Sequence, residues 1–216
     1  MKLTREKITI MSVLVVAVLV LAGFTLLLIK DRTYFHTPQY TPGEELESDI
    51  LVVYYSRSGN TEAMAREIAR TMNTHIVKIE AKSYSLDFRG WRNASHDAWA
   101  KNKTEISPEV ADLTPYRLIF MGAPIWWYRP APPLWTFVDK NDFTDKSVIL
   151  FSTFNSSFRA MEIEEFKKQI EQKGGTFVDH VYIRRGRVFY QKSGKELILE
   201  TQTLLDAKVP KWEKIQ

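Results

Sequence analysis

The segment from Ile50 to Thr61 reads ILVVYYSRSGNT, and it indicates the fold more clearly than any other part of the chain. Its first half, Ile50–Tyr55, is a continuous apolar run, which is typical of a strand covered on both faces. A polar loop follows at 56–61, and the pattern then changes to a helical period with an apolar face at Met64, Ala65, Ile68, Ala69 and Met72. A buried strand, a short loop and an amphipathic helix together form one unit of a parallel α/β sheet.

The same alternation continues along the rest of the chain. Apolar runs predict four further strands, at 76–79, 118–121, 148–151 and 181–183. Amphipathic spacing predicts helices over 61–73 and 160–172, and a last helix that Ser193 can cap. We therefore expect an α/β domain with a doubly wound, five-stranded parallel sheet and helices on both faces. In such sheets ligands bind beyond the carboxyl ends of the strands.

Composition divides the 216 residues into four parts: a short flank at 1–7, a transmembrane anchor at 8–29, a linker at 30–48 and the α/β domain at 49–216. The anchor carries no charge, and as a helix it would be about 33 Å long, which matches a hydrocarbon core of about 30 Å. A cleaved signal peptide is the alternative, but the apolar run is longer than usual and no small-x-small site follows it. Two Thr-Pro pairs, a glycine and an acidic run predict a flexible linker.

The positive charge is concentrated near the amino terminus. Residues 1–32 hold five basic and two acidic side chains, and so account for +3 of the net charge of +4. The nearly neutral remainder argues against a nucleic-acid partner, which requires a concentrated basic face. We interpret its densest basic run, 184–187, as a solvated turn or strand end rather than a phosphate site. The charges flanking the anchor favour a cytoplasmic amino terminus and a domain on the outer face of the cell membrane.

The residue types exclude several kinds of chemistry. The chain has no cysteine, so it has no disulfide, no thiolate metal site and no cysteine nucleophile. Its four histidines are scattered without the spacing of a metal site, and no G-x-S-x-G motif is present. We therefore predict neither a catalytic side chain nor a bound metal.

The loop after the first predicted strand has the parts of an anion site. Ser56–Thr61 offers three hydroxyls, a glycine and the free N–H groups of a helix amino terminus. It lacks both the lysine of a nucleoside-triphosphate loop and the G-x-G-x-x-G of a dinucleotide loop. The alternative is an ordinary helix start, with Ser58 or Asn60 as the cap and Gly59 easing the turn.

The loop expected after the strand at 118–121 is aromatic and stiff. The run from Gly122 to Pro133 contains Trp126, Trp127 and Tyr128 together with four prolines. Aromatic side chains at the carboxyl end of a strand can stack on a flat cofactor. A hydrophobic cap or a protein-binding patch is the alternative. The long aromatic segment at 82–108 is interpreted as core packing, with a flavin cover or a partner surface as alternatives.

Both loops resemble those of the flavodoxin-like, FMN-binding proteins, here in a membrane-anchored form. Ser56-x-Ser58-Gly59-x-Thr61 is similar to the family's phosphate loop, [ST]-x-[ST]-G-x-T. Gly122–Trp127 resembles the G-x-P-I-W-W segment of a subgroup, and Pro132–Phe137 continues the likeness into the next helix. The resemblance covers about residues 49–206 and implies a flavodoxin-like fold that binds FMN noncovalently.

The resemblance also implies which residues bind the cofactor. The phosphate contacts would come from the hydroxyls of Ser56, Ser58 and Thr61 and from the backbone N–H groups of Arg57, Gly59, Asn60 and Thr61. The isoalloxazine ring would be flanked by Pro124, Ile125, Trp126, Trp127 and Tyr128, with Trp127 favoured for stacking. The third loop, at 152–157, lacks the glycine that is frequent in the family, so its contact with the flavin stays open.

Three functions follow from these features. The leading hypothesis is a membrane-anchored, flavodoxin-like protein that binds FMN and transfers electrons to a redox partner protein or a small acceptor such as a quinone. One alternative is an NAD(P)H-dependent quinone or flavin reductase of the same fold. The other is a flavin-free protein-binding module. The sequence does not decide between an electron carrier and an enzyme.

Overall fold

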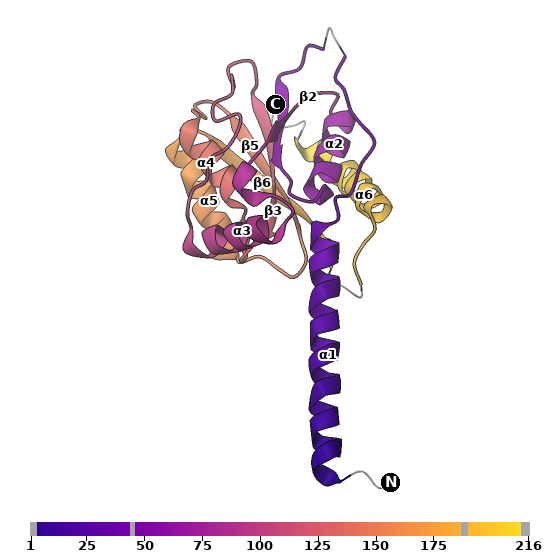
Figure 1. Ribbon diagram of the computed structural model, residues 1–216. Coiled ribbons are helices and arrows are strands. Elements are labelled where there is room, and N and C mark those ends of the chain that lie inside the picture. The colour runs from indigo at the N-terminus through magenta and orange to yellow at the C-terminus, as the bar shows by residue number, and fades with distance from the viewer. Residues whose placement is uncertain (1–3, 44–45, 187–189, 213–216) are drawn as a thin grey trace. The chain divides into compact units, whose positions relative to one another are not determined.

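The computed structural model describes residues 4–43, 46–186 and 190–212, and the chain forms two compact units, Met1–Thr33 and Tyr34–Gln216 (Figure 1). The first unit contains one helix, α1 (Arg5–Arg32), which begins before the expected span at 8–29. Its stretch Arg5–Leu26 is long and apolar enough to cross a membrane, a criterion that a signal sequence near the amino terminus also meets.

The second unit is built on a parallel sheet with the strand order β2-β1-β3-β5-β6. Its strands are β1 (Ile50–Tyr55), β2 (His75–Ile79), β3 (Leu118–Trp126), β5 (Ser147–Phe154) and β6 (Thr176–Arg184). The short β4 (Arg129–Pro130) pairs antiparallel with the end of β3. The predicted five-stranded, doubly wound parallel sheet is confirmed.

Helices cover both faces of this sheet, as expected. Figure 1 shows α2 (Asn60–Thr71) and α6 (Gly194–Trp212) on one face, and α3 (Phe88–Ala100), α4 (Pro132–Lys140) and α5 (Ala160–Gln172) on the other. A 3-10 turn, η1 (Lys82–Tyr84), precedes α3. The predicted helix at 160–172 therefore has its expected bounds, and the one predicted at 61–73 is α2.

Strand β1 lies inside the sheet, between β2 and β3, and its sequence is apolar throughout. Leu51 and Val53 belong to the core cluster under α4 and α5, whereas Val52 and Tyr54 belong to the cluster under α2 and α6. Side chains alternate between the two faces of a strand, so a strand covered on both sides has no polar face. Because β1 ends at Tyr55 and runs parallel to its neighbours, the loop that follows lies at the carboxyl edge of the sheet.

The structure corrects the expected end of the third strand. The aromatic loop was expected to begin at Gly122, but β3 continues through Trp126. The ladder persists because Pro124 still pairs with Thr153 of β5. Gly122 also gives the Phe151 ring the space that it occupies, since a Cβ at Gly122 would collide with that ring. The segment at 122–126 is therefore part of the sheet.

Helix ends show which cap predictions were right. Ser193 caps α6 as expected: its hydroxyl accepts from the N–H of Glu196, and its own N–H donates to the Glu196 carboxylate at 2.7 Å. The helix α3 was not predicted within the aromatic segment at 82–108. It begins after Asp87, whose carboxylate accepts from the N–H of Gly90 at 2.7 Å.

The segment Tyr34–Tyr40, which we call the strap, differs from the flexible linker that was expected. Its residues contact α2: the Arg66 guanidinium donates to the Thr37 carbonyl at 2.9 Å. The Tyr40 hydroxyl donates to the Thr74 carbonyl at 2.9 Å. The compact unit accordingly starts at Tyr34, ahead of the first strand.

Candidate functional site

Three chain segments meet at the carboxyl edge of the sheet, as the topology predicts. In the register of β1, β3 and β5, Tyr54 pairs with Gly122, and Gly122 pairs with Phe151. The loop at 56–59 therefore leaves the sheet beside the extended part of β3. The candidate site consists of this loop, the β3–β4 turn and the end of β5.

The loop after β1 has the geometry of an anion site. Gly59 is the N-cap residue of α2 with φ 84°, a conformation that glycine adopts without strain. Within the described residues, no side chain hydrogen-bonds to the first turn of α2 as a cap, so neither Ser58 nor Asn60 has the capping role considered above. Uncapped N–H groups and the helix dipole favour an anion at this position. The loop therefore fits a phosphate group.

The hydroxyls of the loop keep protons that an anion can accept. The Ser58 hydroxyl accepts from the side-chain amide of Asn60 at 3.0 Å, which leaves its own proton available. The hydroxyls of Thr61 and Thr153 lie 2.8 Å apart, and both residues are buried. When Thr153 donates to Thr61, the Thr61 proton can be donated to a phosphate. The contact also brings the end of β5 into the site, and 152–154 belong to this strand rather than to the expected loop.

Arg57 organises the segment that precedes α3. Its guanidinium donates to the carbonyls of Ser85 at 3.0 Å and Asp87 at 3.4 Å, and its Nε donates to the Tyr84 carbonyl at 3.3 Å. These bonds hold the aromatic segment at 82–108 next to the anion loop. The aromatic segment is thereby part of the wall beside the candidate site.

Trp127 and Tyr128 form the tip of the β3–β4 turn. Both have positive φ, 47° and 70°, as a two-residue turn between antiparallel strands requires. Trp127 is 51% exposed and Tyr128 is 38% exposed. The indole N–H of Trp127 donates to the Ser95 hydroxyl at 2.9 Å, and the Arg159 guanidinium lies 4.5 Å from the Tyr128 ring centroid. Two accessible aromatic side chains are thus held beside the anion loop.

Trp126 has a different environment from its two neighbours. Its ring packs edge-on against Tyr55 at 5.6 Å and against Tyr84 at 5.5 Å. Pro124 and Ile125 are half-buried, and Ile125 pairs with Pro130 of β4. Of the aromatic residues predicted to flank a ring, Trp126 therefore packs against Tyr55 and Tyr84, whereas Trp127 and Tyr128 present exposed surface.

A buried ion pair anchors the turn to α5. Arg129 is 6% exposed, its Nε lies 3.4 Å from the Glu162 carboxylate, and its guanidinium lies 4.1 Å from the Trp135 ring centroid. Burial lowers the pKa of Arg129, and the Glu162 carboxylate opposes this shift. Lys101 also reaches Glu162, at 3.2 Å. The residues after the exposed tip are therefore fixed in place.

Two phenols beside the site stay protonated near neutral pH. Burial raises the pKa of Tyr55 and of Tyr84, so both phenols remain protonated. The Tyr84 hydroxyl donates to Asp97 at 3.0 Å. Among the described residues, no group of three or more possible ligands could hold a metal ion. The arrangement can bind and orient a flat anionic molecule.

Sequence reasoning missed several residues that shape the site. Ser95 and Arg159 contact predicted site residues from other elements, and Phe35 contacts the anion loop from the strap. Thr153 lies in the segment 152–157, whose contact with the flavin was left open, and its hydroxyl contacts that of Thr61. No local pattern marks these positions, because each contact joins residues distant in sequence. Arg184 is the exposed last residue of β6, as the strand-end interpretation predicted, whereas Arg187 lies outside the described residues.

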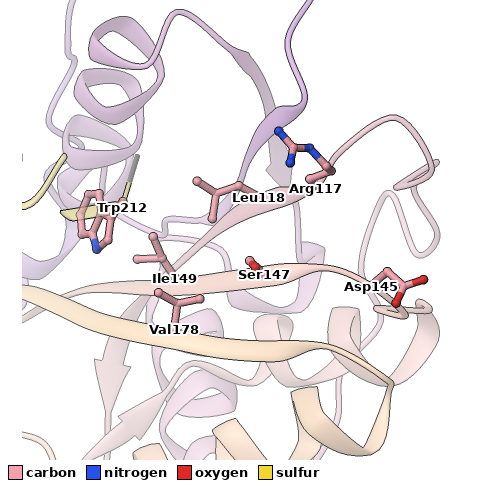
Figure 2. Close-up of a pocket in the computed structure, with 7 residues that line it drawn as sticks. All are labelled: Arg117, Leu118, Asp145, Ser147, Ile149, Val178 and Trp212. Atoms are coloured by element: carbon pink, nitrogen blue, oxygen red, sulfur yellow. The ribbon is translucent and has the colours of Figure 1, made fainter. Parts of the chain in front are cut away.

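A separate pocket lies at the opposite, amino-terminal edge of the sheet. Its volume is about 150 Å³, and Figure 2 shows its apolar side chains gathered toward Trp212, with Arg117 and Asp145 at the other end. It is lined by the starts of β3 and β5 rather than by their carboxyl ends. This pocket is therefore not part of the candidate site.

The parallel sheet, the uncapped anion loop after β1 and the aromatic turn after β3 define an α/β protein of the kind that binds flat phosphorylated cofactors. The profile of the flavodoxin family matches residues 49–197, and the chain belongs to this family. A comparison with curated proteins found no match.

Solved structures share the fold at low sequence identity. A protein classed as a flavoprotein from Bacteroides uniformis superposes with a TM-score of 0.56 and 23% identity, over 71% of this chain and 97% of that one. A flavoprotein from Lactobacillus acidophilus in complex with FMN has a TM-score of 0.51 and 24% identity, over 62% and 91%. A similar protein from Bacteroides eggerthii has a TM-score of 0.55 and 21% identity, over 73% and 96%. The family match and the FMN-bound neighbour support FMN as the cofactor.

Proposed function

We propose that the protein is a single-pass, membrane-anchored flavodoxin that binds FMN noncovalently and transfers electrons. Its acceptor would be a redox partner protein or a small molecule such as a quinone. The observation that carries the proposal is the uncapped amino terminus of α2 beside the exposed Trp127–Tyr128 turn. One end of this site suits a phosphate and the other suits a flat ring.

The chain's own residues would bind and orient the cofactor. The hydroxyls of Ser56, Ser58 and Thr61 would hold the phosphate, together with the backbone N–H groups of Arg57, Gly59, Asn60 and Thr61. Trp127 and Tyr128 would flank the ring, with Pro124, Ile125 and Trp126 behind them. Bound FMN would supply the redox chemistry, and the protein would tune it through packing and dipoles. The buried, protonated phenols of Tyr55 and Tyr84 would keep ionic charge away from the ring.

The cofactor proposal is tested with the full chain purified in detergent. We expect a yellow protein, or uptake of added FMN, and no oxidation of NADH or NADPH by the FMN-loaded protein alone. Pyridine-nucleotide oxidation would instead favour the reductase alternative. The absence of both a bound flavin and FMN uptake would favour the flavin-free binding module.

Paired substitutions separate the anion loop from general effects on folding. Ser58→Ala combined with Thr61→Val removes two hydroxyl donors, and we expect FMN affinity to fall by about tenfold or more, since a hydrogen bond to a charged group contributes about 1.5–3 kcal/mol. Thr203→Val is the matched control, because its hydroxyl is exposed on α6 and bonds to its own helix. Equal affinities in the two variants would contradict the assignment.

Membrane anchoring rests on α1. We propose that 8–29 spans the cell membrane, with 1–7 as its flank, 30–48 leading to the domain at 49–216, and the domain on the outer face. An epitope tag at the amino terminus should stay on the mature protein and in the carbonate-washed membrane fraction. A cleaved signal sequence would lose the tag. Protease added to intact cells should digest the domain, and protection of the domain would place it on the cytoplasmic face.

A further inference from the structure

The strap runs along α2 and reaches the anion loop. At its amino-terminal end, the Phe35 N–H donates to the Ser58 carbonyl at 2.9 Å, and the Tyr34 hydroxyl donates to the Glu62 carboxylate. Further along, Arg66 donates to both the carbonyl and the hydroxyl of Thr37 at 2.9 Å. The strap therefore contacts the loop backbone itself and the first turn of the helix that the loop begins.

Two glycines from different elements make room for Phe35. A Cβ at Gly59 would collide with the Phe35 carbonyl, and a Cβ at Gly194 would collide with the Phe35 ring. The ring is thus held at the start of α6 while the backbone lies against the anion loop. Because close packing leaves no space for another arrangement at either glycine, the position of Phe35 and that of the Ser58–Gly59 backbone depend on each other.

The strap also contacts a buried charged group, the carboxylate of Glu62. Glu62 is 3% exposed and lies in the first turn of α2, next to the position where an anion would bind. An uncompensated carboxylate there would repel a phosphate dianion. Tyr34 donates to this carboxylate, Arg66 forms an ion pair with it, and the Lys78 ammonium lies 3.7 Å away. Burial and the Glu62 carboxylate raise the pKa of Tyr34, so its phenol remains a donor.

We propose that the strap is a positioning element of the phosphate site, in which Phe35 holds the Ser58–Gly59 backbone and Tyr34 holds the Glu62 carboxylate. The identity of the anion, the FMN phosphate, rests on the proposed function. The strap follows directly on α1 in the chain, so the segment that joins the proposed anchor to the domain is built into the cofactor site.

The test compares FMN with riboflavin, which has the same ring but no phosphate. Full-length protein in detergent is titrated with each ligand, and the dissociation constants are read from quenching of flavin fluorescence. Phe35→Ala should weaken FMN binding by about tenfold, and Tyr34→Phe by about three- to tenfold, which corresponds to the loss of one hydrogen bond. Riboflavin binding should stay within about twofold. Tyr40→Phe is the matched control, because it removes a strap contact far from the loop, and it should leave both constants unchanged.

Each other outcome overturns the proposal or the function on which it rests. Equal weakening of FMN and riboflavin would show that the strap only stabilises the fold, and unchanged FMN binding would show that it does not act on the loop. If the wild-type protein binds neither flavin, the proposed function fails. In that case, the effect of the strap on the loop is tested by measuring hydrogen exchange of the backbone amides at 57–61 without ligand. Faster exchange in Phe35→Ala and Tyr34→Phe than in Tyr40→Phe supports it, and equal exchange overturns it.

Discussion

At the scale of single residues, a few backbone positions determine whether the anion loop can form. Gly59 combines a positive φ with the close approach of the Phe35 carbonyl, so two separate constraints require glycine there. Trp127 and Tyr128 adopt positive φ without being glycine, which costs of order 1 kcal/mol each and requires support from the surrounding structure. The buried Arg129 and the contacts of both side chains provide that support.

Gly59→Ala tests the first of these positions. We expect the free energy of unfolding to fall by about 1–3 kcal/mol, because the substitution adds backbone strain and displaces Phe35. Denaturant unfolding followed by tryptophan fluorescence measures the change. Gly43→Ala is the control, since nothing lies within 4 Å of a Cβ at Gly43. A loss of the same size in both variants would contradict the explanation.

The environment of His180 leads us to expect that the free energy of unfolding depends on pH. It is half-buried and packs against Phe158, its Nε2 lies 3.2 Å from the Ser152 hydroxyl, and desolvation lowers its pKa to about 4 while Asp179 opposes the shift. In the unfolded chain the pKa of histidine is about 6.5, so as pH falls from about 6.5 to about 4 the unfolded state binds a proton that the folded state does not. Stability is therefore full above this window and falls by about 3 kcal/mol through it.

The measurement is denaturant unfolding at about pH 7.5 and about pH 4.5, for the wild-type chain and for His180→Gln. The wild type should lose about 2–3 kcal/mol more than the variant between the two conditions, because glutamine does not titrate. Carboxylates elsewhere affect both chains alike and cancel in the comparison. Parallel losses in the two chains would show that His180 is not the group responsible.

At the scale of elements, β3 shows how tertiary packing extends a strand beyond its local signal. The apolar run at 118–121 predicted a short strand, whereas Gly122 and Pro124 suggested its end, since both weaken strands. In the structure β3 continues because β5 pairs with it as far as Thr153 and because Gly122 makes room for the Phe151 ring. The turn at 127–128 therefore projects from a central strand rather than from a free loop.

Gly122→Ala should destabilise the protein by about 1–3 kcal/mol through overpacking against Phe151. Phe151→Leu alone should also destabilise it, because it leaves a cavity in the core. In the double variant, the loss of unfolding free energy should be smaller than the sum of the two single losses by about 1 kcal/mol or more. The smaller leucine side chain leaves space for the methyl group that alanine adds at position 122. Denaturant unfolding of all four chains provides the measurement. Strict additivity would show that the two side chains do not compete for space.

At the scale of the whole molecule, the chain is divided into two compact units. The unit Met1–Thr33 contains a helix that can cross a membrane, and the unit Tyr34–Gln216 contains a complete α/β core with the candidate site. Because FMN would bind only the folded domain, its binding free energy adds to the stability of that domain.

We therefore expect FMN at one hundred times its dissociation constant to raise the free energy of unfolding by about 2.7 kcal/mol. Thermal unfolding of the full chain in detergent, with and without FMN, measures this as an increased midpoint temperature. Riboflavin at the same multiple of its own constant should give an equal shift, because the linkage depends only on saturation. A midpoint that does not respond to FMN would contradict binding to the folded state.

Much of the fold and part of the site could be predicted from the sequence. The strand at 50–55 and the helix at 160–172 have their expected bounds, because a local period of apolar residues determines each of them. The anion loop was recognised because its hydroxyls and glycine are contiguous. The helix α3 was missed, because its buried positions are the small residues Gly90, Ala94 and Ala98, whereas its large apolar residues Phe88 and Trp99 are exposed.

The sequence alone determined the unit of strand, loop and helix, the parallel sheet and the apolar helix near the amino terminus, since each depends on the pattern of neighbouring residues. Only the tertiary structure decided that Thr153 meets Thr61, that Ser95 holds Trp127 and that the strap rests on Gly59. Each of these contacts joins segments far apart in the chain. No local period marks such a contact, because its free energy arises only when the packed sheet brings both partners together.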